Sequence, residues 1–410
     1  MRLFGDGRAA LANDAATAER LSWPVRRRSR TEPEIVLHAR AGDPRREPWI
    51  APPGWHARLG LEPRPSRGAA PRRWTYLAEP PGVDRYLRRL AASRRQAGAT
   101  VGFAGLGRVG GVAATLIAAM ATRASGVREL LVHDADIANQ ERWLLELGSI
   151  AVWRGRDRLP LVRAAGVDEM MRRCDVLLFV ASAAVPPLGT RGDVRLVQFE
   201  PNRALLAPFL AAAKHEEFTG LFLVVSDPVE WLAQASFHDS NCDRNGRFDG
   251  DGLAPERIAG LGLGVMWARV LSAARRHACE AKVARHGAAF GPHSADVIAF
   301  DDVRAPYRER SALLTRAARE CNYQVRELGF LPYVGPGVSS VALTLPRLLA
   351  GDEVPASPLV DGIYFGAPSR CEWGVWPSRL RMAPSVWGAV RDLHARMQHR
   401  AAALSLLFER

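Results

Sequence analysis

The sequence has no hydrophobic run long enough to cross a lipid bilayer and no apolar leader at its N-terminus. The best candidate, residues 110–121, is much shorter than the roughly 20 apolar residues that a membrane-spanning helix needs. Hydrophobic residues still make up 48% of the 410 residues and charged residues 24%, which is ordinary for a globular protein. We therefore expect a cytoplasmic protein of two or three packed units that makes no membrane contact.

Cysteine pairs are lacking as well. The chain has five cysteines, an odd number, and they are scattered with no Cys-x-x-Cys spacing. This pattern argues against a zinc site and against a framework of disulfides, and it favours reduced thiols. The residues are Cys174, Cys242, Cys279, Cys321 and Cys371.

Lysine is nearly absent, since the chain has only Lys214 and Lys282 among its 56 basic residues. The formal net charge of +13 is concentrated in residues 1–100, which hold 20 Arg against 10 Asp or Glu. A basic arm of this kind could bind nucleic acid or an acidic partner. A general bias toward arginine explains much of it, and no nucleic-acid-binding module is evident. We expect no nucleic-acid partner.

The chain divides into three parts by pattern. Residues 1–97 are rich in Arg and Pro and predict an irregular N-terminal extension, with one helix near residues 82–98. Residues 98–237 alternate apolar runs with helical patterns, which predicts a parallel α/β sheet. Residues 238–410 combine long helices with short strands and predict an α+β domain that holds the substrate and the catalytic groups.

A glycine motif opens the second part. Gly105, Gly107 and Gly110 form G-x-G-x-x-G directly after an expected strand and at the start of an expected helix. The glycines permit a tight turn and a close approach of a pyrophosphate, and the N–H groups of the helix N-terminus favour an anion. The motif predicts a Rossmann-type dinucleotide site, while a purely structural glycine turn is the alternative.

Asp134 stands at the end of the second expected strand, 24 residues after Gly110. A carboxylate at this point can accept hydrogen bonds from the ribose hydroxyls of an adenosine, which favours NAD. Arg123 and Arg128 flank the same strand. NADP therefore stays open.

His293 lies in the stretch GPHSADVIAF, between a Gly-Pro step and an expected strand. An imidazole titrates near neutral pH and can carry a proton in catalysis. A polar residue at a turn before a strand is the alternative, and the residues around His293 in the sequence do not decide between the two.

Several segments, in order, resemble the lactate/malate dehydrogenase family over residues 99–410. The resemblance implies a Rossmann-type sheet followed by an α+β domain, NAD(P)-dependent hydride transfer to a small-molecule substrate, and a homodimer or homotetramer. It also implies that His293 protonates the substrate carbonyl as hydride arrives. The segments that carry the resemblance are 127–149, 175–187, 221–234, 290–297 and 328–343.

The sequence departs from this family where the substrate is held. The family uses an aspartate that orients the histidine and an arginine that clamps the substrate carboxylate, spaced Asp-x-x-Arg. We place Met266 at the position of the aspartate and Leu271 at that of the clamping arginine, and match Arg269 to a different position. Methionine and leucine cannot replace these charges. We therefore expect a substrate other than pyruvate or oxaloacetate, held in part by Met266 and Leu271.

Three other residues could compensate. Asp227 replaces an asparagine of the family and could pair with His293 or hold the substrate, or it could be a solvated acid at a strand end. Arg275, one turn beyond Leu271, could reach the substrate or be a solvated helix charge. In the loop that polarises the carbonyl, Arg191 or Arg195 could supply the arginine that the family uses.

The loop at residues 239–251 has oxygen-bearing side chains at alternating positions, as in a calcium-binding loop. Arg244 stands where such a loop needs glycine, and no glutamate closes it. We expect a polar insertion and no metal site.

Three functional hypotheses follow. The first is an NAD(P)-dependent oxidoreductase that acts on an unusual 2-hydroxy or 2-oxo compound. The second is a catalytically inactive relative that binds NAD or a protein partner. The third is an adenylating enzyme of the ubiquitin-activating type, suggested by the Asp-x-Asp segment that starts at Asp134 and opposed by the lack of a zinc-binding cysteine pair.

Overall fold

The fold is described from a computed structural model of the chain. Within residues 1–97 the structure describes five short strands, and beyond them it describes residues 98–151, 158–183, 196–246, 252–371, 374–378 and 380–406. The helix expected near residues 82–98 lies outside the described residues, except for residue 98.

The five N-terminal strands form one sheet in the order β1-β2-β3-β5-β4. The inner pairs β2–β3 and β3–β5 are parallel, and the outer pairs β1–β2 and β4–β5 are antiparallel. The strands are β1 (Arg2–Gly5), β2 (Arg8–Ala12), β3 (Glu34–His38), β4 (Leu61–Pro63) and β5 (Arg73–Ala78).

Strands between residues 99 and 260 form a six-stranded sheet in the order β11-β10-β9-β6-β7-β8, with every pair parallel. This confirms the Rossmann-type sheet predicted from the sequence. The strands are β6 (Ala99–Ala104), β7 (Val127–His133), β8 (Leu161–Ala164), β9 (Val176–Phe179), β10 (Leu221–Val224) and β11 (Ile258–Gly260).

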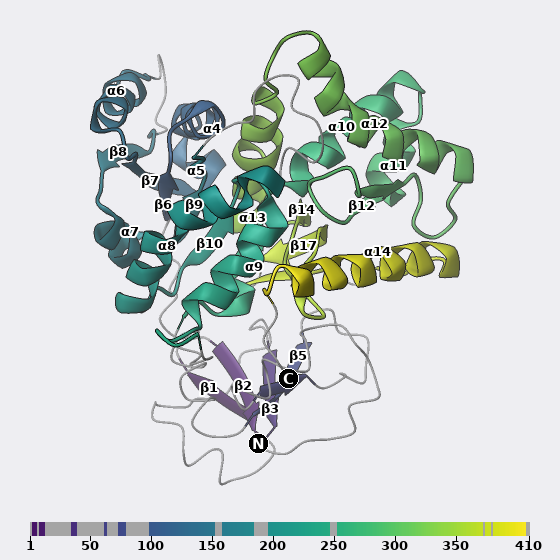
Figure 1. The fold of residues 1–410 in the computed structure, drawn as a ribbon, viewed down its shortest axis with the longest axis horizontal. Helices are drawn as coiled ribbons and strands as arrows, with labels where there is room; N and C mark the ends of the chain where they lie inside the picture. The colour runs from purple at the N-terminus through teal and green to yellow at the C-terminus, as the bar shows by residue number, and fades with distance from the viewer. Residues whose placement is uncertain are drawn as a thin grey trace.

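Helices cover both faces of this sheet (Figure 1). Successive residues of a strand point to opposite faces, so a strand covered on both sides is apolar throughout. On β6, Val101 and Phe103 pack in one buried cluster, while Ala104 packs in the other. The covering helices are α4 (Arg108–Ala119), α5 (Thr122–Ser125), α6 (Ile137–Gly148), α7 (Val167–Arg173), α8 (Phe199–His215) and α9 (Val229–Ser240).

The second half is mixed α and β, as predicted. Its helices are α10 (Leu263–Arg276), α11 (Glu280–His286), α12 (Arg308–Glu327), α13 (Thr344–Ala350) and α14 (Pro384–Ala403). Its strands are β12 (Ala288–Phe290), β13 (Ile298–Phe300), β14 (Val354–Ala356), β15 (Leu359–Val360), β16 (Ile363–Tyr364), β17 (Ala367–Cys371) and β18 (Val375–Pro377). Short 3₁₀ turns lie at η1 (Leu196–Gln198) and η2 (Pro255–Arg257), and η3 (Pro336–Ala342) is a π-helical turn.

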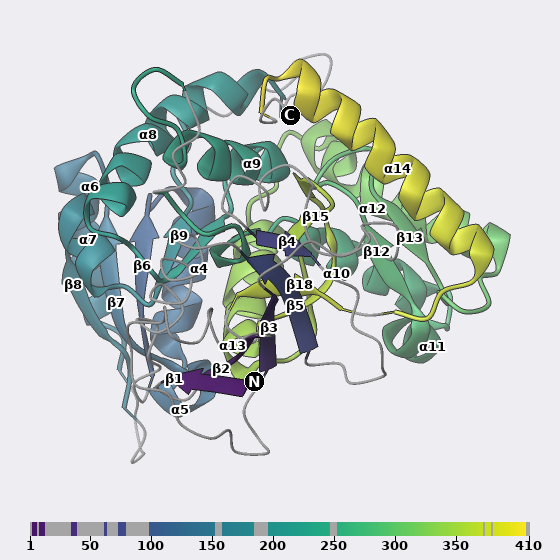
Figure 2. The ribbon, with the colours of Figure 1, turned by 90° about the horizontal axis from the view of Figure 1, so that it is seen from below.

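Helix α14 lies along the outside of the second half (Figures 1 and 2). Val386, Val390, Leu393 and Met397 are buried on one of its faces, and Leu404 packs against the same cluster. The spacing of these residues in the sequence predicts this apolar face, because residues three, four and seven apart share one side of a helix.

Two simple findings bear on the expectations from composition. In the part of the chain that the structure describes, no helix is long and apolar enough to traverse a bilayer. None of the five cysteines, which all lie within the described residues, forms a disulfide.

Candidate functional site

The glycine motif forms a tight turn at the carboxyl end of β6. Gly105 has φ +101°, a conformation that side chains disfavour, and a Cβ on it would come within 2.5 Å of the Ala181 backbone. A Cβ on Gly110 would collide with the Gly105 carbonyl oxygen. A Cβ on Gly107 would meet nothing within 4 Å. The first and last glycines are thus needed for packing, while the middle one borders open space.

Helix α4 begins next to this space. Its N-cap is Gly107, no side chain caps its first turn, and no acidic residue lies in that turn. The exposed N–H groups and the positive end of the helix dipole suit an anion. A dinucleotide pyrophosphate fits the turn, because the open side of Gly107 lets it approach the backbone closely.

Asp134, expected to bind ribose, holds the glycine turn itself. Its Oδ2 accepts hydrogen bonds from the Leu106 N–H at 2.8 Å and from the Asn139 amide at 3.0 Å. Its Oδ1 accepts from the Asp136 N–H at 3.0 Å. A carboxylate has about four acceptor sites, so these three bonds leave room for about one more. Any ribose contact made by Asp134 would add to its structural role.

Trp143 completes the support of the turn, and the sequence analysis gave it no role. Its indole N–H donates to the Leu106 carbonyl at 2.8 Å. A Cβ on Gly111 would collide with its ring. The second glycine of the pair 110–111 is the sequence signal that a bulky side chain packs there.

His293 lies near the carboxyl end of β11, on the side of the sheet where the glycine turn follows β6. It is 7% exposed and stands next to Gly262, where a Cβ would come within 2.5 Å of the His293 Cβ. Its Nε2 is 3.8 Å from Oδ1 of Asp227, which follows β10. The carboxylate therefore stands where it stabilises a protonated imidazole. The structure thus places side by side two of the residues that the sequence analysis proposed as catalytic.

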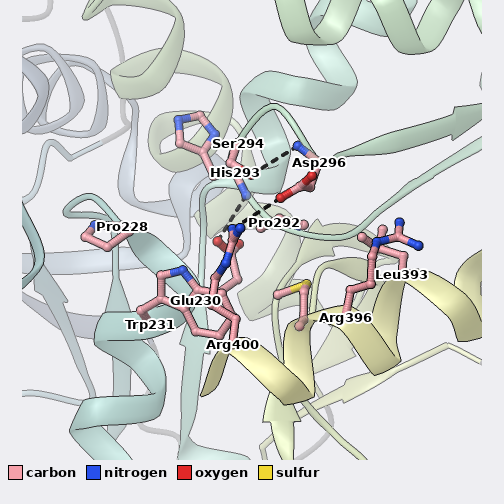
Figure 3. Close-up of a pocket in the computed structure, with 11 residues that line it drawn as sticks. Pro228, Glu230, Trp231, Pro292, His293, Ser294, Asp296, Leu393, Arg396 and Arg400 are labelled. Carbon is pink, nitrogen blue, oxygen red and sulfur yellow. Dashed lines mark hydrogen bonds and ion pairs between the residues drawn. The ribbon is translucent and has the colours of Figure 1, made fainter. Parts of the chain in front are cut away.

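Glu230, which the sequence analysis did not single out, holds the His293 segment. Its Oε2 accepts the His293 backbone N–H at 3.0 Å, and its Oε1 accepts the Ser357 hydroxyl at 2.8 Å. The imidazole points away from Glu230 while the backbone nitrogen faces it (Figure 3). Burial raises the pKa of the Glu230 carboxyl to about 7, against the lowering effect of both hydrogen bonds.

A small cavity of about 80 Å³ is lined by Glu230 and His293 and, on the opposite side, by residues of α14 (Figure 3). Pro228 and Trp231 of the α9 start lie on one side, and Arg396 and Arg400 of α14 lie on the other. The cavity is too small for a dinucleotide, so it is a gap beside the histidine and not the cofactor crevice.

Helix α10 carries the residues that the sequence places near the substrate. Counted from Met266, the spacing Asp-x-x-Arg reaches Arg269 and not Leu271. Leu271 packs against the apolar cluster that contains the buried Met266. Arg269 is buried to 9% exposure, and its Nη1 donates to the Ala318 carbonyl at 3.2 Å. The Arg269 guanidinium is therefore bound by the backbone of α12.

Arg275 is not directed to the substrate region. Its Nε donates to Glu280 at 2.9 Å, and its side chain is 71% exposed. Of the two alternatives that the sequence left open for Arg275, the structure shows the solvated charge on the helix surface.

Other named residues lie elsewhere. Arg191 and Arg195 fall outside the described residues. Asp239, expected at the start of the polar loop, belongs to the last turn of α9 and forms a two-point ion pair with Arg203, at 2.8 Å for each contact. Asp249 and Asp251 also fall outside the described residues, and in the rest of the structure no group of three acidic, histidine or cysteine side chains is placed to hold a metal ion.

Solved structures similar to this one are lactate and malate dehydrogenases. A lactate dehydrogenase from a Medee basin deep-sea metagenome library is 17% identical and aligns with a TM-score of 0.59 over 76% of this chain and 100% of its own. The minor L-lactate dehydrogenase of Enterococcus mundtii is 20% identical, with a TM-score of 0.59 over 74% of this chain and 98% of its own.

The malate dehydrogenase of Picrophilus torridus is 17% identical, with a TM-score of 0.55 over 74% of this chain and 96% of its own. The chain has the lactate/malate dehydrogenase fold. No protein-family model and no curated protein matches the chain. The resemblance read from the sequence is thus confirmed for the fold.

Proposed function

We propose that this protein is an NAD(P)-dependent oxidoreductase that acts on a non-standard 2-hydroxy or 2-oxo compound in the cytoplasm. The observation that carries the proposal is the position of the glycine turn and Asp227 directly after β6 and β10, with His293 beside Asp227. Strands β6 and β10 are two strand spacings, about 10 Å, apart. In parallel α/β sheets, ligands bind in the crevice at the carboxyl ends of the strands.

A nicotinamide bound there supplies or accepts hydride. The glycine turn and the α4 N-terminus would hold the pyrophosphate. His293 would hold the proton that the carbonyl oxygen takes up, and Asp227 would stabilise the charged imidazole from 3.8 Å. Asp227 would thus take over, from the segment after β10, the task that the family's aspartate has at the position of Met266 on α10.

Calorimetry with NAD, NADH and NADPH tests the cofactor site. Gly107→Ala fills open space beside the turn, so we expect at least about tenfold weaker binding, or 1.4 kcal/mol, with unchanged thermal unfolding. His293→Gln is the matched control, because it should bind the cofactor normally. Absence of cofactor binding to the wild-type protein would exclude the proposal.

A second candidate is a catalytically inactive protein that binds NAD or a protein partner, and the buried Met266 favours it. The two candidate functions predict different effects of substituting His293. Substitution by alanine should lower the turnover of an enzyme about 10²–10⁴-fold. In the inactive protein the same substitution would leave cellular function intact, as judged by complementation of a deletion strain.

The assembly is also a proposal. By likeness to the family we propose a homodimer or homotetramer, with no nucleic-acid partner. Light scattering during size-exclusion chromatography measures the mass directly, and a monomer of 44.8 kDa would contradict it.

A further inference from the structure

We propose that a groove between α10 and α12 binds the non-reacting part of the substrate, and that this part is an extended apolar chain with an anionic far end. The inference rests on the proposed function, because it names the substrate class of that same site. The groove has a cavity volume of about 560 Å³ and is lined also by residues between Leu331 and Ser339. Helices α10 and α12 pack side by side (Figures 1 and 2).

The volume exceeds what a small 2-oxo acid needs. It lies within the range of about 300–1,000 Å³ that is typical of sites for larger organic ligands. The groove therefore suits a substrate with a substantial body beyond its reacting carbon.

One end of the groove lies beside the proposed catalytic site. Val265 lines the groove and follows by three residues Gly262, which contacts His293. Three residues of α-helix span about 4.5 Å. Tyr333 lines the same end, and Arg108, the residue after Gly107 of the glycine turn, stacks its guanidinium 5.9 Å from the Tyr333 ring. This near end thus adjoins both the histidine and the glycine turn.

The groove runs from this end toward the C-terminus of α10. A Cβ on Gly335 would lie 3.1 Å from Val265, and Ala318 accepts a hydrogen bond from Arg269. Residue numbers on the facing segment therefore fall as those on α10 rise. Arg316 belongs at the far end, with Arg276 of the last turn of α10.

The two ends differ in chemistry. The near end is apolar, with Val265, Val325 and Leu331 among its lining residues. The far end carries the guanidinium groups of Arg276 and Arg316. Arg276 donates to the Ser272 hydroxyl at 3.1 Å, and Arg316 has no ion-pair partner in the described part of the chain.

Arg269 and Glu320 line the groove between the two ends, and Glu320 is the one acidic side chain among the lining residues. Three arginines against one glutamate leave a surplus of positive charge, which an anionic group would complement. An apolar chain that ends in a carboxylate or a phosphate matches this order of surfaces, since arginine pairs with either anion in a fixed geometry.

The length of the groove sets the length of the apolar chain that a ligand can place in it. From Val265 to Arg276 the helix rises about 16 Å. Dodecanoate, a twelve-carbon carboxylate, has nearly this length and serves as the binding probe. The probe needs no cofactor, so its binding reports on the groove separately from the proposed oxidoreductase function.

Calorimetry with dodecanoate and with dodecan-1-ol tests the inference on the full chain. We expect dodecanoate to bind, Arg316→Gln and Arg276→Gln each to weaken it at least tenfold, and dodecan-1-ol to bind at least tenfold more weakly. Arg275→Gln is the matched control, because Arg275 lies on the same helix outside the groove and should leave binding unchanged. Thermal unfolding confirms that each variant is folded.

Three outcomes would overturn the proposal: no binding of dodecanoate, equal binding by the groove variants, or a change in oligomeric state on Arg316→Gln, which would make the groove a subunit interface. Binding of dodecanoate without binding of NAD would instead leave the groove standing and overturn the oxidoreductase function. Binding of NAD without dodecanoate would overturn the groove alone.

Discussion

The two sides of the proposed crevice are built in different ways. On the side formed by the glycine turn the backbone itself is packed closely, because Gly105 and Gly110 leave no room for a Cβ and Gly107 borders open space. On the side formed by α10, Met266 is buried in an apolar cluster of side chains. Side chains of similar volume can replace one another in such a cluster at low cost, whereas a Cβ added at Gly105 or Gly110 has nowhere to go.

The largest effect that we expect is a loss of stability when the glycine turn is changed, and it would sharpen this comparison. Gly110→Ala places a Cβ against the Gly105 carbonyl, so we expect the free energy of unfolding to fall by about 3 kcal/mol or more. Urea unfolding measures it. Gly388→Ala in α14 is the control, because a Cβ there meets nothing within 4 Å and alanine stabilises a helix by about 0.5–1 kcal/mol. Equal effects at the two glycines would contradict the packing described.

A second, pH-dependent effect concerns the His293 segment. Burial raises the pKa of Glu230 from 4.5 to about 7, so the folded state binds a proton that the unfolded state has released. The stabilisation by Glu230 is therefore complete below pH 4.5 and is lost as pH rises through about 7. A shift of this size corresponds to roughly 3 kcal/mol.

Glu230→Gln, which cannot ionise, is the comparison for this effect. We expect the wild-type protein to lose stability relative to this variant between pH 5 and pH 8, as followed by urea unfolding in a series of buffers. A difference between the two proteins that does not change with pH would mean that Glu230 is ionised throughout. The hydrogen bonds from His293 and Ser357 would then outweigh its burial.

The smallest effect is expected on the exposed face of α10. Arg275→Ala removes an ion pair with Glu280 at the surface, and pairs in this setting contribute little to stability because solvent screens them. We expect no change in cofactor binding and no resolvable change in the free energy of unfolding. A large loss of activity would show that Arg275 reaches the substrate after all.

The fold was predictable from the sequence where the signals are local. Continuous apolar runs such as residues 99–104 and 176–179 indicate strands buried on both faces, and the structure has both. The glycine turn was equally predictable, because its three glycines lie within the six residues from 105 to 110. The apolar face of α14 followed from its spacing alone.

Several features of the site were not readable. Glu230 looks like any helix residue in the sequence, and its burial depends on the packing of His293 and Ser357, which are 63 and 127 residues away. The hydrogen bonds of Asp134 to its own turn were also hidden, because a strand-end acid looks the same whether it binds ribose or backbone. The contact of Arg269 with Ala318 was equally hidden, because the two residues are 49 positions apart in the chain.

The sequence by itself determined which segments become strands and helices and where the backbone can turn, because these depend on side chains close together in the chain. Only the tertiary structure decided which polar groups are buried, which of them meet, and where a groove remains between helices. Burial and the pKa of a carboxyl depend on atoms contributed by distant segments, and no local pattern records them.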